Sequence, residues 1–132
     1  MPGLFQTPQC ARHLLAQNAE LMRSPRDTDE AVAARMRRQK VLYQPEKLFR
    51  VLLWEGALHA LICPPDVMAG QVDRLVGLLG VSTVQLGVVP FGAQPPLTAK
   101  HGFWIFDEAR VIVEAISTEL RHVRRVSATS DP

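Results

Sequence analysis

The sequence predicts an α/β or α+β fold, in which a small mixed sheet of about four strands carries helices packed on it. Three observations indicate this class. Apolar stripes with helical spacing dominate the N-terminal part, strand-like apolar runs follow them, and the last two runs resemble a C-terminal β-hairpin. With 132 residues the chain has the size of one domain, so we expect residues 1–132 to form a single domain.

Two helices are expected in the N-terminal part. Thr7 followed by Pro8 is typical of an N-cap with proline at the first helical position, and an apolar stripe continues to Ser24-Pro25, which ends the helix. A second helix begins near Asp27, because Asp27 and Glu30 have the spacing of a capping box. Acidic residues in its first turn and basic residues in its last turns match the helix dipole at both ends.

Strands and a third helix follow. Leu48–Trp54 is apolar apart from Arg50, which predicts a central strand covered on both faces. The third helix opens at Pro64-Pro65 and ends at Gly80, a residue suited to a helix C-terminus. Thr83–Val89 alternates between apolar and polar or small residues, as a half-buried strand does.

A long loop and a hairpin complete the expected elements. Pro90–Lys100 has no periodicity and is long for a connection in a compact domain, which favours a functional role. Phe103–Phe106 and Arg110–Glu114 flank a short polar segment and predict the C-terminal hairpin.

Composition and motifs exclude several classes of function. The net charge of +2 is too small to indicate nucleic-acid binding. Cys10 and Cys63 lie far apart, the histidines lack ligand spacing, and the standard catalytic and phosphate-binding motifs are absent. We therefore expect no metal and no cofactor. No apolar run is long enough to span a membrane and no signal peptide is seen, which favours the cytoplasm.

Glu55 is the most informative polar residue, because it ends an apolar strand and a buried carboxylate is costly unless paired. His59 lies four residues further on, so one helical turn places both side chains on one face. Glu114 ends the last strand in a comparable way. If the two strand ends meet, the two carboxylates form a candidate acid/base site. Pairing of the glutamates with Arg35, Arg38 or Arg50 explains them equally well.

The aromatic residues in the loop and hairpin suggest a second site. Phe91, Phe103 and Trp104 lie in or beside these segments, and apolar strand residues are usually core residues. Some of them are placed to line a pocket closed by the loop. Stacking of these aromatic residues on nucleic-acid bases is less consistent with the sequence, because basic residues do not alternate with the aromatic ones.

Several pieces of sequence, taken in order, resemble a known family. These pieces are PGLFQTPQCARHLL, Arg35-x-x-Arg38-Gln39, VLLWEGAL, DVMAGQVDRL, VQLGVVPFG with a following Pro-Leu, and an aromatic hairpin that ends in Val-Glu. The chain resembles, over roughly residues 2–116, the C-terminal domain of unknown function of actinobacterial XRE-type helix-turn-helix regulators. Such regulators are often described as antitoxin-like, after the Scr-type toxin–antitoxin-like systems.

The resemblance implies a domain that follows a DNA-binding domain and senses a ligand or binds a small partner protein. The helix-turn-helix portion lies outside this sequence, so we expect no direct nucleic-acid binding by this chain. The chain departs from the family pattern at Trp54, where an acidic residue is usual, and at His59, where an arginine is expected. The positions that match the family pattern are Arg35, Arg38, Gln39, Glu55, Gln71, Pro90, Phe91 and Glu114.

The leading hypothesis is a stand-alone binding domain for a small-molecule ligand or a small partner protein. An alternative is a small enzyme recruited into specialised (natural-product) metabolism, which uses Glu55, His59 and Glu114 for acid/base chemistry or an aromatic-walled pocket for a cyclisation. An exposed strand edge that pairs two copies into a homodimer is compatible with both. The expected ligand contacts are Arg35, Arg38, Gln39, Glu55, His59, Phe91, Phe103 and Trp104.

Overall fold

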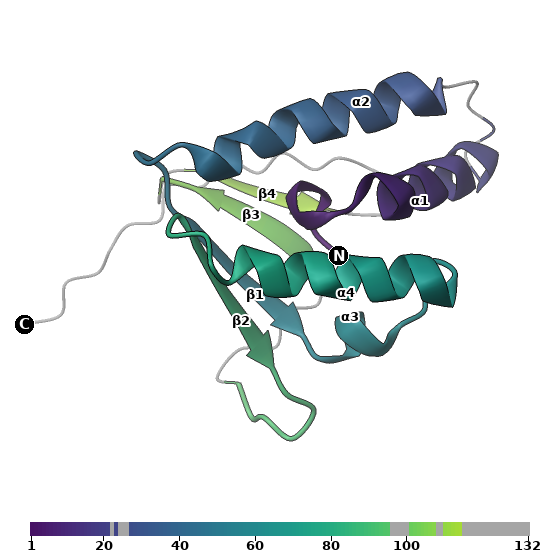
Figure 1. Ribbon diagram of the computed structural model, residues 1–132. Helices are drawn as coiled ribbons and strands as arrows, with labels where there is room; N and C mark the ends of the chain where they lie inside the picture. Colours follow the sequence, from purple (N-terminus) through teal and green to yellow (C-terminus); the bar gives the residue numbers. More distant parts are fainter. Residues whose placement is uncertain (22, 24–26, 96–100, 108–109, 115–132) are drawn as a thin grey trace, which may run out of the picture. The chain divides into compact units, whose positions relative to one another are not determined.

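A computed structural model of the chain describes residues 1–21, 23, 27–95, 101–107 and 110–114. The chain divides into two compact units, Met1–Ala93 and Gln94–Pro132. Helices and strands both contribute, which confirms the α+β class (Figure 1). The first unit contains η1 (Gly3–Phe5), α1 (Pro8–Leu21), α2 (Thr28–Gln39), η2 (Lys40–Tyr43), β1 (Phe49–Trp54), α3 (Gly56–His59), α4 (Pro65–Leu78) and β2 (Val84–Val89).

The expected helix starts are confirmed by their caps. The Thr7 hydroxyl accepts a hydrogen bond from the Cys10 N–H at 3.2 Å, so Thr7 caps α1. The Asp27 carboxylate accepts from the N–H groups of Asp29 and Glu30 and caps α2. The sequence predicts that α1 ends at Ser24-Pro25, but these residues lie outside the described part of the chain.

The strands pair as two separate two-stranded sheets rather than as the one mixed sheet that the sequence predicts. β1 and β2 are parallel, with Phe49 opposite Val84 and Trp54 opposite Val89, and α3 and α4 lie between them in the sequence. In the second unit, β3 (Gly102–Phe106) and β4 (Arg110–Glu114) are antiparallel, which confirms the hairpin. Apolar periodicity marks each strand but does not specify its partner, so the sequence could not separate the two pairs.

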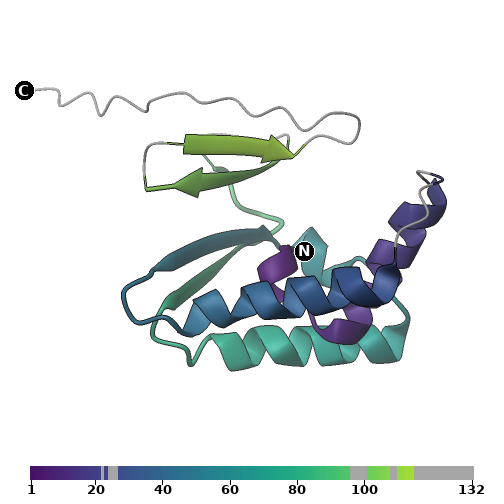
Figure 2. The same ribbon diagram turned by 90° about the horizontal axis from the view of Figure 1, so that it is seen from above.

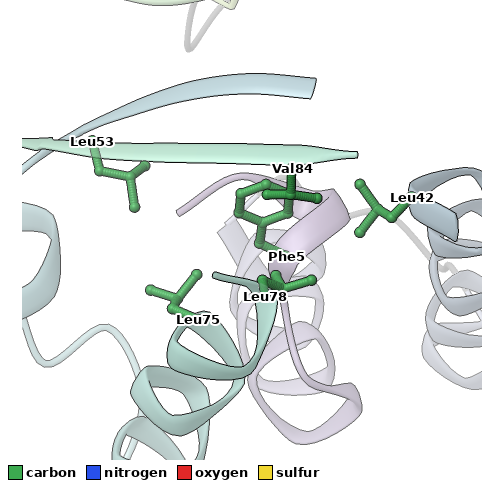
Figure 3. Close-up of a cluster of buried hydrophobic side chains, with 6 residues drawn as sticks. All are labelled: Phe5, Leu42, Leu53, Leu75, Leu78 and Val84. Carbon is green, nitrogen blue, oxygen red and sulfur yellow. The ribbon is translucent and has the colours of Figure 1, made fainter. Parts of the chain in front are cut away.

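The core of the first unit lies between the β1–β2 sheet and α4. Figure 3 shows Leu53 and Val84 pointing from the sheet toward Leu75 and Leu78 of α4, with the Phe5 ring among them. Leu42 closes the same cluster from η2. The short helix η1 contacts both α2 and α4, while α1 packs on α2 (Figure 2). The N-terminal segment is therefore an integral part of the core.

β1 is not covered on both faces as predicted. Leu53 is buried on the face that meets α4, whereas Leu52, on the opposite face, is 71% exposed. On that exposed side, the Arg50 guanidinium donates to Gln85 of β2 at 3.2 Å. Because apolar residues occur on both faces of this strand, the sequence predicted that both faces are buried. In the structure, only one face of the two-stranded sheet packs against a helix of its own unit.

Candidate functional site

The C-terminal ends of β1 and β2 bring together a set of polar and aromatic residues. Because Trp54 lies opposite Val89, the residues that follow each strand emerge at the same edge of the sheet. The Glu55 N–H donates to the Val89 carbonyl at 2.9 Å and extends the pairing by one step. Phe91 follows β2 after a single intervening residue. Ligands of parallel sheets often bind beyond the carboxyl ends of the strands, so this edge is a candidate site.

The Glu55 carboxylate connects both strand ends. Its Oε2 accepts from the Phe91 N–H at 2.8 Å, and its Oε1 lies 3.3 Å from His59 Nε2. The predicted placement of Glu55 and His59 on one face is therefore confirmed, since α3 provides the single turn between them. In the described part of the chain, the Glu55 carboxylate lies beside the His59 imidazole rather than beside Arg35, Arg38 or Arg50.

Phe91 adds an aromatic surface to the pair. Its ring centroid lies 5.7 Å from that of His59, and the two ring planes are tilted by 30°. The Glu55 side chain is 31% exposed and that of His59 is 66% exposed, so solvent reaches both. We call Glu55, His59 and Phe91 the acid–imidazole–aromatic cluster. The cluster offers a carboxylate that orients an imidazole, beside a flat apolar face.

Arg35 and Gln39, which the sequence predicts as ligand contacts, bind the N-terminal segment. Arg35 Nη1 donates to Gln6 Oε1 at 2.6 Å, and Gln39 Nε2 donates to the Gln6 carbonyl at 2.6 Å and the Gly3 carbonyl at 3.3 Å. Both side chains therefore help to hold this segment on α2. Arg38 is exposed on the same helix.

The remaining predicted residues belong to the second unit. Phe103 is an exposed residue of β3, and the rings of Trp104 and Phe106 stack with centroids 6.4 Å apart. The Arg110 guanidinium lies 4.8 Å from the Phe106 ring centroid, in a cation–π arrangement. Glu114 pairs with Gly102 at the end of β4, and its side chain lies outside the described part of the structure. The predicted meeting of Glu55 and Glu114 stays a prediction.

A shallow, open apolar groove lies on the exposed side of α4. It has a volume of about 500 Å³, and a smaller hollow of about 150 Å³ between α4 and the strands shares Val72 and Val76 with it. Among the described residues, Asp73 is the one charged residue that lines the larger groove. A contiguous patch of exposed apolar side chains often marks a binding site. The α4 groove is lined by Leu61, Pro65, Met68, Ala69, Val72, Asp73 and Val76.

Sequence reasoning missed this groove, although a signal for it is present. The apolar residues of α4 recur at helical spacing, and they form two adjacent stripes. Met68, Leu75 and Leu78 are buried, and Gln71 is buried in the same row. Val72 and Val76 occupy the neighbouring row, which faces solvent. A helix with two apolar stripes needs two partners, and the described first unit supplies only one.

A metal site and a membrane-spanning helix are not found in the part of the chain that the structure describes. No group of three or more His, Cys, Asp or Glu side chains is arranged to hold a metal ion there. Among those same residues, no helix has the length and apolar character needed to cross a membrane.

Comparison with known proteins gives one result. The model of the family described as Domain of unknown function (DUF5753) matches residues 1–128, nearly the whole chain. No curated protein and no solved structure matches significantly. The order of elements described above, from the capped α1 to the C-terminal hairpin, lies within the matched residues. The chain therefore belongs to the DUF5753 family of domains of unknown function.

Proposed function

We propose that this domain binds a segment of a partner protein in the α4 groove, as the sensing part of a helix-turn-helix type regulatory system. The observation that carries the proposal is the second apolar stripe of α4, which is exposed along the groove and is not among the buried residues of the core. The regulatory context is supported by the resemblance of the motif order to XRE-type regulators. The small net charge of +2 agrees with binding a protein rather than nucleic acid.

The lining of the α4 groove indicates the chemistry of its occupant. Its walls are apolar side chains that run along a helix, a surface that suits the apolar face of an amphipathic helix. Asp73 lies in that lining and is exposed. A partner segment that buries apolar residues there is stabilised further by a lysine or arginine placed beside Asp73. We therefore infer an amphipathic helix with one basic residue at the edge of its apolar face.

Val76→Asp tests this proposal directly, because it places a charge in the groove at a residue that is 60% exposed and outside the core. The probe is a displayed library of helical peptides selected on the unaltered protein. We expect the selected peptides to lose at least about tenfold in affinity for Val76→Asp, which corresponds to about 1.4 kcal/mol. Binding is measured by fluorescence anisotropy or calorimetry, with circular dichroism to confirm that the variant is folded.

Two further variants make the result specific. Leu21→Asp introduces the same charge at an exposed apolar residue of α1 and should leave peptide affinity unchanged. Asp73→Lys reverses the charge of the lining. Peptides selected on this variant should therefore carry an acidic residue at the position where peptides selected on the unaltered protein carry a basic one. Peptides that bind the unaltered protein and Val76→Asp equally well contradict the proposal.

A second function, small-molecule binding or acid/base catalysis, is favoured by the acid–imidazole–aromatic cluster. Glu55 holds the imidazole of His59 by a hydrogen bond, and a carboxylate that orients an imidazole is a common arrangement for proton transfer. The exposed Phe91 ring offers a planar apolar face to a ligand. This candidate includes the enzyme of specialised metabolism that the sequence leaves open.

Native electrospray mass spectrometry beside a denatured mass tests the second function. If the cluster holds a ligand, the purified protein retains a small molecule that Glu55→Ala loses, because this change removes the acceptor for His59 and for the Phe91 N–H. Glu46→Ala, at an exposed turn residue, is the matched control and should keep the molecule. Equal retention by both variants removes the cluster from consideration.

A further inference from the structure

The two cysteines of the chain, which lie 53 positions apart in the sequence, meet in the folded protein. Cys10 is in the first turn of α1, and Cys63 directly precedes the two prolines that open α4. Their Sγ atoms are 3.0 Å apart, and both are free thiols. A disulfide bond is about 1 Å shorter than this separation, so a small movement brings the sulfurs to bonding distance.

The surroundings of the two thiols are apolar. Cys10 is 0% and Cys63 4% exposed, and together with Met68 they form a buried cluster of their own, separate from the main core. Burial, and next the hydrogen bond with Cys63, raise the pKa of the Cys10 thiol to about 12. At neutral pH the Cys10 thiol is therefore protonated, and reaction with reagents in solution is slow. Both cysteines are buried, and Cys63 is the one that keeps a small exposure, so we expect a small oxidant to reach its sulfur first.

We propose that Cys10 and Cys63 form an oxidation site, in which a peroxide converts the adjacent thiols into an intramolecular disulfide that joins α1 to the start of α4. In the first step the Cys63 sulfur attacks a peroxide oxygen, the O–O bond breaks, and Cys63 becomes a sulfenic acid as one water leaves. The Cys10 sulfur then attacks Cys63, the S–O bond breaks and a second water leaves. The thiols lose two electrons and two protons in total, and hydrogen peroxide is reduced to two waters.

The position of the pair gives the disulfide a structural effect. It closes a loop that contains α2, β1 and α3, so it restricts the unfolded chain over a long segment. The bond also fixes the N-terminal half of α1 against the residues that begin α4, where Met68 belongs to the same buried cluster as the two cysteines. We expect the oxidised protein to melt about 10 °C above the reduced one, a shift in the range for a loop of this length.

Intact mass and peptide mapping of the full chain test the proposal. The reduced protein is treated with dilute hydrogen peroxide, quenched with catalase, and then unfolded in the presence of an alkylating reagent. We expect a loss of about 2 Da, no alkylation, and a reversal by reducing agent. Tryptic digestion should then yield one cross-linked species that joins residues 1–12 to residues 51–74, because trypsin cleaves after Arg12, Arg50 and Arg74.

Other products overturn the proposal. They are alkylation of both cysteines after peroxide treatment, a gain of oxygen atoms in place of the loss of hydrogen, or a chain-to-chain disulfide as the main product. Cys10→Ala is the matched control, since Cys63 then has no neighbouring thiol and should gain oxygen or alkylating reagent instead. If the mass falls by about 2 Da but the melting temperature does not rise, the claim that the disulfide stabilises the folded protein is wrong.

Discussion

Replacement of Phe5 by alanine is expected to lower the free energy of unfolding by about 4 kcal/mol, the largest effect of any single change considered for this chain. Phe5 is 1% exposed and packs in the cluster formed by Leu53, Val84, Leu75 and Leu78. Its removal leaves a cavity between the sheet and α4 that these residues cannot fill without moving the strands. Urea denaturation followed by circular dichroism measures the change.

Phe91→Ala is the matched control for Phe5→Ala, because it makes the same substitution at a ring that is 71% exposed. We expect a loss of less than about 1 kcal/mol, since little apolar area leaves the protein interior. The two variants together separate the cost of a cavity from the cost of losing an aromatic ring. Similar losses for both would show that η1 is not part of the core.

Gln71→Met should lower the free energy of unfolding by about 3 kcal/mol, although methionine has nearly the same length and shape. Gln71 is 0% exposed, and its side chain makes two hydrogen bonds to the main chain of the N-terminal segment. Its Oε1 accepts from the Thr7 N–H at 2.8 Å, and its Nε2 donates to the Phe5 carbonyl at 2.8 Å. Methionine leaves both main-chain groups without these partners, and each unsatisfied group costs about 1–3 kcal/mol.

Two comparisons test whether the hydrogen bonds cause the loss. Gln17→Met makes the same change on the exposed side of α1 and should alter the free energy of unfolding by less than about 0.5 kcal/mol. Gln71→Glu keeps an acceptor for Thr7 but places a carboxylate beside the Phe5 carbonyl. We expect it to be least stable at neutral pH and partly restored in acid, where the neutral carboxyl group can donate. A Gln71→Met protein as stable as the unaltered one would contradict the assignment.

Local signals in the sequence predicted most of the elements. Helix caps depend on residues within one turn, so Thr7 and Asp27 marked the starts of α1 and α2 correctly. The turn from Glu55 to His59 was predicted for the same reason, because both residues belong to one short helix. The pairing of strands depends on contacts between distant segments, and therefore the division into two sheets was not visible.

The candidate sites, like the sheets, depend on contacts between distant segments that the sequence does not show. Glu55 was recognised as the end of an apolar strand, but the hydrogen bond that it accepts from the Phe91 N–H joins residues 36 positions apart and requires the parallel register of β1 and β2. The approach of Cys10 to Cys63 likewise depends on the packing of α1 beside α4. Arg35 and Gln39 were interpreted as ligand contacts because polar residues at family-favoured positions suggest function. The structure shows that both hydrogen-bond the N-terminal segment.

The attachment of the N-terminal segment to α4 has a consequence for the synthesis of the protein. Thr7 and Phe5 are synthesised before their partner Gln71, which is 64 and 66 positions further along the chain. At roughly 5–20 residues translated per second, these residues wait about 3–13 s before Gln71 of α4 is synthesised. During that interval the apolar Phe5 has no core to enter. We therefore expect the nascent segment PGLFQ to stay open to chaperones until α4 has been synthesised.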